Sequence, residues 1–257
     1  MPGKKNRVIG LFFVLIGLGV VLTGCSGAKV LEEPKSMPLV EPLAVTSNEN
    51  LSLVLDWVIV RDGPGAWAKN ADWDEYLLRV LNLSNEEVVI ASVSVYDSLG
   101  GRQRMHFSRE GLVRSSREQK KRYKDQGLTV KAGVGGDLLV LAGGAAWVAG
   151  STAGVVSAVT LGAYTGAAVA GIALAPVLVG TGIAVNMRNN KVDKEIFRRY
   201  TAFPFRLEPG EGESLDVFFP LAPSPTKLEL GYMISGRDYS LTLDVGEPLN
   251  GLHLVPE

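Results

Sequence analysis

Few residues in this chain have the side chains that carry catalytic or metal chemistry. The sequence contains one cysteine, Cys25, and two histidines, His106 and His253, which lie far apart. None of them has neighbours at the spacing of a zinc site, and His253 is expected to be exposed. The Gly-x-Ser-x-Gly motif of a serine nucleophile does not occur. We therefore expect no catalytic residues, no metal and no cofactor, and predict that the protein is not an enzyme.

Two short motifs nevertheless have chemical potential. Gly133-Val134-Gly135-Gly136 is glycine-rich, but it lacks the Gly-Lys-Ser/Thr ending of a phosphate-binding loop. Asp72-Trp73-Asp74-Glu75 places carboxylates beside an aromatic ring next to a predicted turn. This second motif fits either a cation or sugar site or the capped start of a strand, and the turn favours the strand start. The net charge of −1 gives no indication of nucleic-acid binding.

The beginning of the chain has the pattern of an export signal. Lys4, Lys5 and Arg7 supply positive charge, and an apolar run of 14 residues follows from Val8 to Val21. The run is short for a membrane-spanning helix and has the flanks of a signal peptide, which we assign to residues 1–24.

The tetrapeptide after this run, Leu22-Thr23-Gly24-Cys25, resembles the lipobox of bacterial lipoproteins. The resemblance implies cleavage before Cys25, a thioether diacylglycerol on its sulfur and acylation of its new amine, as by palmitate. A lone cysteine can otherwise be a core residue, whereas an intramolecular disulfide is excluded because the chain has no second cysteine. Ser26 stands where lipoproteins retained in the inner membrane typically carry Asp. The resemblance thus implies a lipid-anchored protein of the bacterial outer membrane, mainly facing the periplasm.

Residues 25–50 contain Pro34, Pro38 and Pro42 among scattered charges, which predicts an extended tether. A strand along the edge of the folded domain is the alternative for part of this range.

The mature chain then shows the alternating, β-branched pattern of strands separated by turn residues. Seven strands are predicted: Leu51–Val60, Tyr76–Leu83, Val88–Tyr96, Ala202–Leu207, Ser214–Phe219, Lys227–Ile234 and Tyr239–Val245. The fold class is therefore mainly β with an α insertion, and residues 51–107 and 200–257 form the two halves of one β-sandwich. The pattern is loosely similar to the immunoglobulin-like modules of envelope lipoproteins, which implies a fold and no function.

The insertion begins with an exposed basic helix over residues 108–131. Residues 132–187 follow with Asp137 as their only charge, and a basic return segment occupies residues 188–199. Leu138–Leu161 and Ala163–Val185 are each long enough to span a bilayer, so they predict a helical hairpin whose turn is at Gly162–Gly166. A turn nearer Pro176 is the alternative.

Small residues recur at every fourth position through this hairpin. The ladder consists of Ala142, Ala146, Gly150, Gly154, Ala158, Gly162, Gly166 and Ala170. Such faces let helices approach closely in lipid, which predicts a membrane-inserted, self-associating hairpin. The segment resembles the glycine-zipper hairpins of some outer-membrane lipoproteins. An interface buried in an oligomer and the core of a soluble subdomain are the alternatives.

The basic residues that flank the hairpin fit contacts with anionic lipid headgroups as well as they fit a solvated helix face. The candidate contacts are Arg117, Lys120, Lys121, Arg122, Lys124, Arg188 and Lys191. The expected partners are membrane lipid, further copies of the chain as a homo-oligomer and an envelope protein, but not nucleic acid. The sequence predicts a structural component of the envelope or of a transport or secretion assembly. The alternative is a periplasm-facing binding module whose hairpin docks a protein partner.

Overall fold

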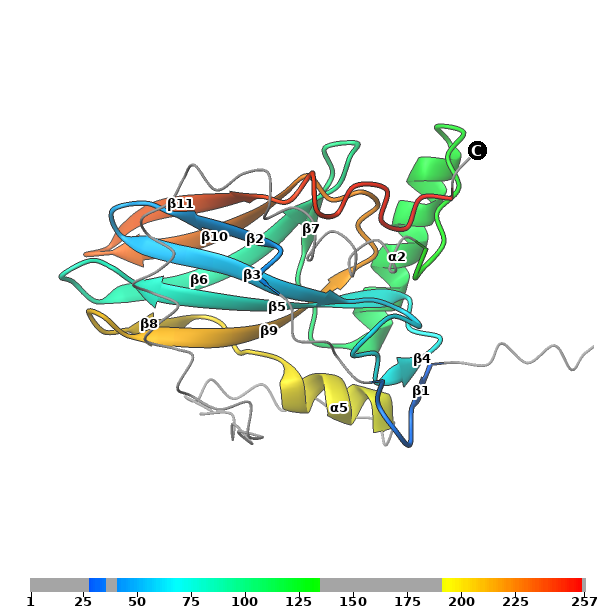
Figure 1. The fold of residues 1–257 in the computed structure, drawn as a ribbon, viewed down its shortest axis with the longest axis horizontal. Coiled ribbons are helices and arrows are strands. Elements are labelled where there is room, and N and C mark those ends of the chain that lie inside the picture. Colours follow the sequence, from blue (N-terminus) through cyan, green and yellow to red (C-terminus); the bar gives the residue numbers. More distant parts are fainter. Residues whose placement is uncertain (1–27, 36–40, 135–190, 256–257) are drawn as a thin grey trace, which may run out of the picture.

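The computed structural model describes residues 28–35, 41–134 and 191–255, and its elements form antiparallel sheets flanked by helices (Figure 1). The strands and helices are β1 (Lys29–Val30), β2 (Ala44–Ser47), β3 (Leu51–Ile59), β4 (Ala68–Lys69), β5 (Trp73–Asn82), β6 (Val88–Tyr96), β7 (Arg102–Arg104), α2 (Arg109–Lys124), α5 (Lys191–Arg199), β8 (Phe205–Leu207), β9 (Gly212–Pro220), β10 (Lys227–Ile234) and β11 (Arg237–Asp244). The signal peptide, Cys25, the ladder of small residues and Arg188 lie outside the described residues.

The strands form two larger sheets and one short pair. The four-stranded sheet has the order β2-β3-β5-β9, and the five-stranded sheet has the order β11-β10-β6-β7 with β8 also paired to β6. β1 and β4 pair separately. The seven predicted strands correspond to β3, β5, β6, β8, β9, β10 and β11, so the prediction of a mainly β fold is confirmed. The additional strands are mostly too short for an alternating pattern to reveal them.

The two larger sheets share one hydrophobic core and together form what we call the β domain. In β10 the residues from Leu228 to Ile234 alternate strictly between buried and half-buried positions, because successive side chains of a strand point to opposite faces. Tyr76 of β5 and Phe219 of β9 meet edge to face in this core, with ring centroids 5.1 Å apart. Burial of each such side chain contributes about 1.5–3 kcal/mol to stability.

The insertion lies between two short strands, β7 and β8, that share one edge of β6. β7 pairs with Ser94–Tyr96 and β8 with Val88–Ile90, at opposite ends of the same edge of β6. Both run antiparallel to β6, so they lie in line with each other and the chain between them leaves the sheet and comes back to it.

The two ends of the insertion are fastened close together on β9. The backbone N–H of His106 donates to the carbonyl of Phe218 (2.9 Å), and that of Thr201 donates to the carbonyl of Asp216 (3.0 Å). Positions two residues apart on a strand are separated by roughly 7 Å. The chain from His106 to Thr201 therefore leaves and returns at neighbouring points of the β domain.

Parts of the range 25–50 form strands, which is the alternative to a tether. β2 pairs with β3 from Ala44 to Ser47, at the edge of the four-stranded sheet. β1 pairs with β4, and the N–H of Leu31 donates to the carbonyl of Trp67 (2.8 Å). The described residues 28–35 thus run along the domain.

Candidate functional site

The helices α2 and α5 and the β1–β4 pair meet the four-stranded sheet at one place, which we call the junction. A separate hydrophobic cluster lies there: Trp67, Ala68, Ala71, Trp73, Leu112, Val192, Ile196 and Phe218, with Ala28, Val30, Val113 and Tyr200 packed against it. Ala28 is the first described residue. Val192 is the second described residue after the hydrophobic segment, the name used below for residues 132–187. The N-terminal segment and the end of the insertion therefore converge on one cluster.

Local sequence explains why both helices pack at the junction. In α5, Val192 and Ile196 are buried, and their spacing of four places them on one helix face. α2 begins at a capping serine, because the side chain of Ser108 accepts a hydrogen bond from the N–H of Gly111 (3.2 Å). Leu112 then enters the cluster from the first turn.

A buried carboxylate ties α5 to the β domain. Glu75 of β5 is 1% exposed; its Oε2 accepts from Trp67 Nε1 (2.6 Å) and its Oε1 from Arg199 Nη1 (3.2 Å). Arg199 also donates to Glu195 (2.8 Å), and its guanidinium lies 5.1 Å from the centre of the Trp67 ring. This Glu75–Arg199 link joins the last turn of α5 to the outer face of the sheet.

Burial dominates the electrostatics of this link. It raises the pKa of the Glu75 carboxyl from 4.5 to about 7, against the opposing positive charge of Arg199. Burial also raises the pKa of the neighbouring Asp216. In contrast, the hydrogen bonds from Arg198 and Arg199 lower the pKa of Glu195 to about 2. Glu75 and Glu195 both pair with Arg199, yet the pKa of Glu75 is raised and that of Glu195 is lowered.

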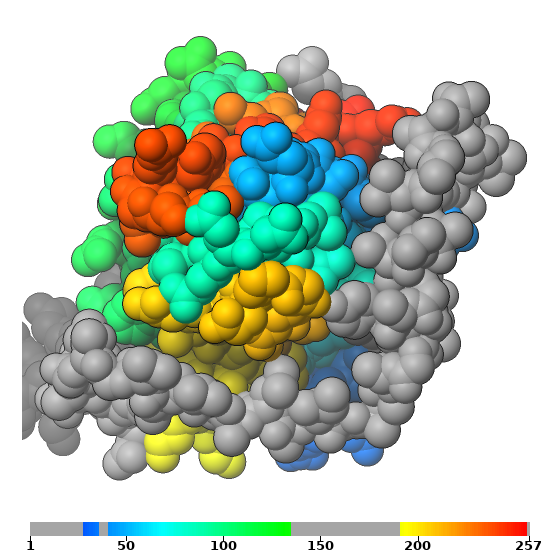
Figure 2. Space-filling model, turned by 90° about the vertical axis from the view of Figure 1, so that its left-hand side faces the viewer, coloured from blue at the N-terminus to red at the C-terminus, as the bar shows by residue number. Residues whose placement is uncertain are grey.

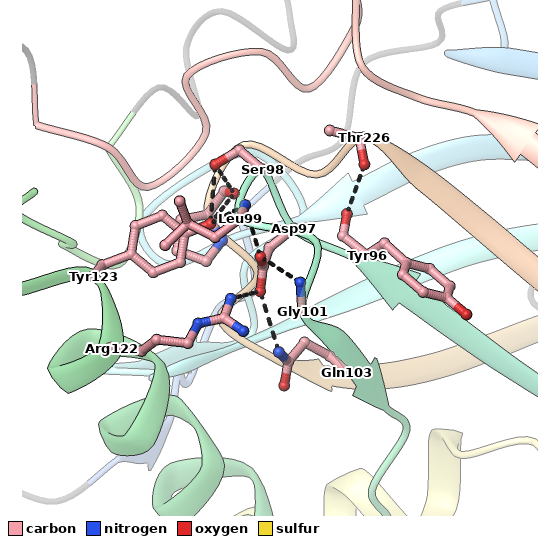
Figure 3. Close-up of polar contacts among 10 residues, drawn as sticks. Tyr96, Asp97, Ser98, Leu99, Gly101, Gln103, Arg122, Tyr123 and Thr226 are labelled. Carbon is pink, nitrogen blue, oxygen red and sulfur yellow. Dashed lines mark hydrogen bonds and ion pairs between the residues drawn. The ribbon is translucent and has the colours of Figure 1, made fainter. Parts of the chain in front are cut away.

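A second buried carboxylate fixes the C-terminal half of α2 (Figure 3). Asp97, in the turn after β6, accepts from the N–H groups of Leu99 and Gly101 (3.0 Å each) and from Gln103 Nε2 (3.2 Å). Arg122 of α2 reaches the same carboxylate with its guanidinium. A Cβ at Gly101 would lie 1.8 Å from Arg122 Nη1, so the glycine makes room for this ion pair.

Further hydrogen bonds hold α2 against the β domain. Tyr123 Oη donates to the carbonyl of Pro223 (3.2 Å). Ser116 Oγ donates to the carbonyl of Asp72 (2.5 Å) and accepts from the N–H of Leu221 (2.9 Å). These contacts bind α2 to the residue before β5 and to the chain that follows β9.

His253 is buried, so the expectation that it would be exposed is wrong. Its Nε2 lies 2.7 Å from Asp74 Oδ2, and both side chains are 0% exposed. The N–H of Gly133 donates to Nδ1 (3.3 Å), which leaves the proton on Nε2 to be donated to Asp74. The N–H of His253 also donates to the carbonyl of Val134 (2.8 Å). The C-terminal segment therefore holds the chain at the start of the hydrophobic segment.

The motif Asp72-Trp73-Asp74-Glu75 is directed inward. Asp72 pairs with Lys120 (3.0 Å) and Arg61 (3.5 Å), and Trp73 belongs to the junction cluster. Asp74 and Glu75 are buried in the contacts described above. These contacts leave no exposed carboxylate pair for a cation or sugar and agree with the start of a strand, since β5 begins at Trp73.

The structure separates the predicted basic contacts into two groups. Lys120 and Arg122 pair inward with Asp72 and Asp97, which gives them a structural role. Four other cations among the described residues, Arg117, Lys121, Lys124 and Lys191, are exposed. For these four, contact with anionic lipid stays a prediction.

The part of the chain that the structure describes shows no group of His, Cys, Asp and Glu side chains that could hold a metal ion. A small hollow borders Glu75 between Trp67, Trp73 and Ile59, and it is too small for an organic ligand. None of the helices within residues 28–35, 41–134 and 191–255 is long and apolar enough to span a membrane.

Sequence reasoning missed the buried carboxylates Glu75, Asp74 and Asp97. Their partners Arg199, His253 and Arg122 lie 124, 179 and 25 residues away along the chain, so no local pattern joins them. Comparison of the chain with protein-family models, with curated proteins and with solved structures found no match.

Proposed function

We propose that this chain is a non-enzymatic lipoprotein of the bacterial outer membrane. Its periplasmic, immunoglobulin-like β-sandwich carries a helical hairpin over residues 132–187 that inserts into the bilayer and associates with copies of itself. Such a protein would serve as a structural part of the envelope or of a transport or secretion assembly. Cys25 is the acylated residue in this proposal.

One observation carries the proposal. Ala28 and Val192 pack in the same cluster, so the chain toward Cys25 and the chain toward the hydrophobic segment leave the domain side by side. Two membrane attachments can act in one bilayer only if they emerge on the same side of the domain. This arrangement supports an anchor and a hairpin that enter the same membrane.

The insertion geometry supports a sandwich interrupted at one point. The two sheets share a core, and the insertion leaves and returns at neighbouring residues of β9. Gly and Ala dilute the hydrophobicity of the hairpin, which fits passage through the inner membrane before insertion elsewhere.

The test is carbonate washing of membranes that contain a Cys25→Ala variant, in which a signal peptide that is cleaved without a lipidated cysteine replaces residues 1–24. If the hairpin inserts, the variant stays in the membrane pellet after the wash, although it has lost its acyl chains. A second variant, in which a flexible linker also replaces residues 135–190, should be released into the supernatant. The wild-type protein is the control for retention.

Two results would contradict the proposal. Release of the Cys25→Ala variant by carbonate would show that lipid is the only anchor, and would favour the binding module whose hairpin docks a protein partner. Recovery of the wild-type protein only in the inner-membrane fraction would exclude the outer-membrane assignment.

A further inference from the structure

The folded domain begins very close to the predicted lipid anchor. β1 starts at Lys29, and Ala28 already packs against the junction cluster. Three residue steps separate Ala28 from Cys25, and fully extended chain of that length reaches about 10 Å. A lipidated Cys25 therefore holds the surface around Ala28 within about 10 Å of the bilayer.

The outward face of α5 lies on the same side of the molecule and is basic. α5 contacts β1, and both follow the lower margin of the molecule in Figures 1 and 2. Lys191, Lys194 and Arg198 are exposed at positions i, i+3 and i+7, which share one helix face. This face is opposite the buried Val192 and Ile196.

The acidic residues of α5 do not neutralise the two lysines, because they have other partners. Asp193 accepts from the backbone N–H of Arg109 (3.2 Å) and pairs with its guanidinium (3.8 Å). Glu195 pairs with Arg198 and Arg199, at 2.6 and 2.8 Å. Lys191 and Lys194 have no ion pair among the described residues.

The neighbouring β1–β4 pair adds two more cations. Lys29 and Lys69 are directly opposite each other in the strand register, and both are exposed. Like charges opposed across a strand pair destabilise it unless an anion lies nearby. We call Lys29, Lys69, Lys191, Lys194 and Arg198 the basic face.

Exposed carboxylates lie beside β1, at Glu32 and Glu33, and also at the other end of the strands. The loops between β2 and β3, β5 and β6, β8 and β9, and β10 and β11 crowd together on the face that Figure 2 shows. Their exposed acidic residues are Glu49, Glu86, Glu208, Glu211 and Asp238. An anionic surface would attract the basic face and repel this loop end.

We propose that the basic face lies directly against the anionic phospholipid headgroups of the membrane that holds the anchor, and orients the β domain on that membrane. The inference rests on the proposed function, because the lipid anchor brings the face to the bilayer. In this arrangement the β domain contacts the lipid surface directly, whereas the extended tether predicted for residues 25–50 would hold it away from the membrane.

Depth-dependent fluorescence quenching tests this seating. The full-length lipidated protein is reconstituted in phosphatidylcholine vesicles, with or without phosphatidylglycerol. Cys25 is the only cysteine, so a single new thiol can be labelled selectively once Cys25 is acylated. Lys194→Cys places a fluorophore on the basic face, and Arg237→Cys, which also removes one exposed cation, places it at the loop end.

The label at residue 194 should be quenched by a headgroup-attached quencher severalfold more strongly than the label at residue 237, and only in vesicles that contain phosphatidylglycerol. Equal, weak quenching at both positions in protein that stays with the vesicles would overturn the seating but leave the lipid anchor intact. Failure of the wild-type protein to stay with the vesicles would instead contradict the proposed function.

Charge variants then identify the residues that make the contact, with the label on a residue that they leave unchanged, at Lys69→Cys. Each lysine near an anionic surface strengthens attachment about fivefold. Lys191→Gln/Lys194→Gln should therefore lower the ratio of protein whose label lies at the headgroups to protein whose label lies in solvent by about 30-fold, as judged from the quenching. The matched variant Arg206→Gln/Arg237→Gln, which removes two exposed cations at the loop end, should leave the ratio unchanged.

A larger effect of the loop-end variant would overturn the assignment of the basic face. Protection of the label in native membranes but not in phosphatidylglycerol vesicles would also overturn it, and would favour a protein partner at this face.

Discussion

Glu75 shows how one buried carboxylate controls the attachment of a helix. It accepts hydrogen bonds from Trp67, the residue before β4, and from Arg199 in α5, and it has almost no contact with solvent. Burial favours its neutral form, whereas Arg199 favours its charged form, and burial has the larger effect on the pKa. The strength of the link between α5 and the sheet is therefore expected to change with pH near neutrality.

Glu75→Gln should flatten the pH dependence of stability. The pKa of Glu75 is higher in the folded state (about 7) than in the unfolded state (4.5), so the stabilising effect of its proton is complete below pH 4.5 and is lost as the pH rises through 7. The difference corresponds to about 3 kcal/mol of unfolding free energy. Glutamine keeps an oxygen acceptor for Trp67 but does not titrate. Thermal unfolding of the full-length protein in mild detergent, followed on both sides of this window, measures the effect.

Part of the slope remains in the variant, because burial raises the pKa of Asp216 as well. Glu195 acts in the opposite direction and in a lower window, since its pKa is lowered to about 2 and the stability it contributes is lost only as the pH falls below 4.5. Glu211→Gln, at an exposed loop position, is the control. Equal slopes for Glu75→Gln and wild type would show that Glu75 is not the titrating group.

At the scale of elements, α2 and α5 are held by separate sets of contacts. In α2, Arg122 pairs with Asp97 in the turn after β6. Ser116 and Tyr123, also in α2, form hydrogen bonds to the chain that follows β9. α5 is fixed by the Glu75–Arg199 link and by two apolar residues in the junction cluster. Each set of contacts lies within the described residues, so we expect each helix to keep its position without the segment 135–190.

Replacement of residues 135–190 by a flexible linker should therefore leave both helices folded. Their anchoring residues lie outside the deleted range, and the insertion ends remain fastened to β9. We expect an unchanged Tm and unchanged amide-exchange protection in α2 and α5. Fast exchange in either helix would show that the hydrophobic segment is needed to hold it.

A longer deletion, from residue 107 to residue 200, is the contrasting case. It removes Leu112, Val192 and Ile196 and exposes Trp67, Trp73 and Phe218 on the sheet. Loss of these contacts leaves a large apolar patch, so aggregation and a lower Tm are expected.

At the scale of the whole molecule, the β domain has two different ends. The junction contains the basic face and parts of both helices, and it holds described residues that are close along the chain to the predicted anchor and to the end of the predicted hairpin, Ala28 and Val192. The opposite end carries the loops that Figure 2 shows, with the exposed Glu49, Glu86, Glu208, Glu211 and Asp238 beside Arg206 and Arg237. This difference supports the proposal that the domain is oriented on a membrane.

Self-association of the hairpin is a property of the whole molecule that the ladder of small residues predicts. Gly154→Leu/Gly162→Leu places large side chains on the ladder of small residues, where backbones are expected to approach each other. The oligomer should dissociate, as measured by size in mild detergent or on native gels. Val156→Leu, off the ladder, should not change the assembly. An unchanged size for the double glycine variant would count against the zipper.

The positions of the strands could be predicted because alternation of apolar and polar residues is a local property of the chain. The same reasoning found α2, whose capping serine and basic turns are adjacent in sequence. It could not assign partners to the charged residues. Lys120 and Lys121 are neighbours of the same type, yet one pairs with Asp72 and the other is exposed. The sequence places them on different helix faces but does not say which face meets the sheet.

The sequence by itself determined the mainly β character, and it predicts an export signal, an acylation motif and a nearly uncharged hairpin that lie outside the described residues, because each depends on residues that are close together in the chain. Only the tertiary structure decided that Asp74, Glu75 and Asp97 are buried with distant partners, and that the segment after Cys25 packs beside the end of the insertion. Those contacts depend on which surfaces the two sheets leave open once their shared core is buried, and that is a property of the assembled fold.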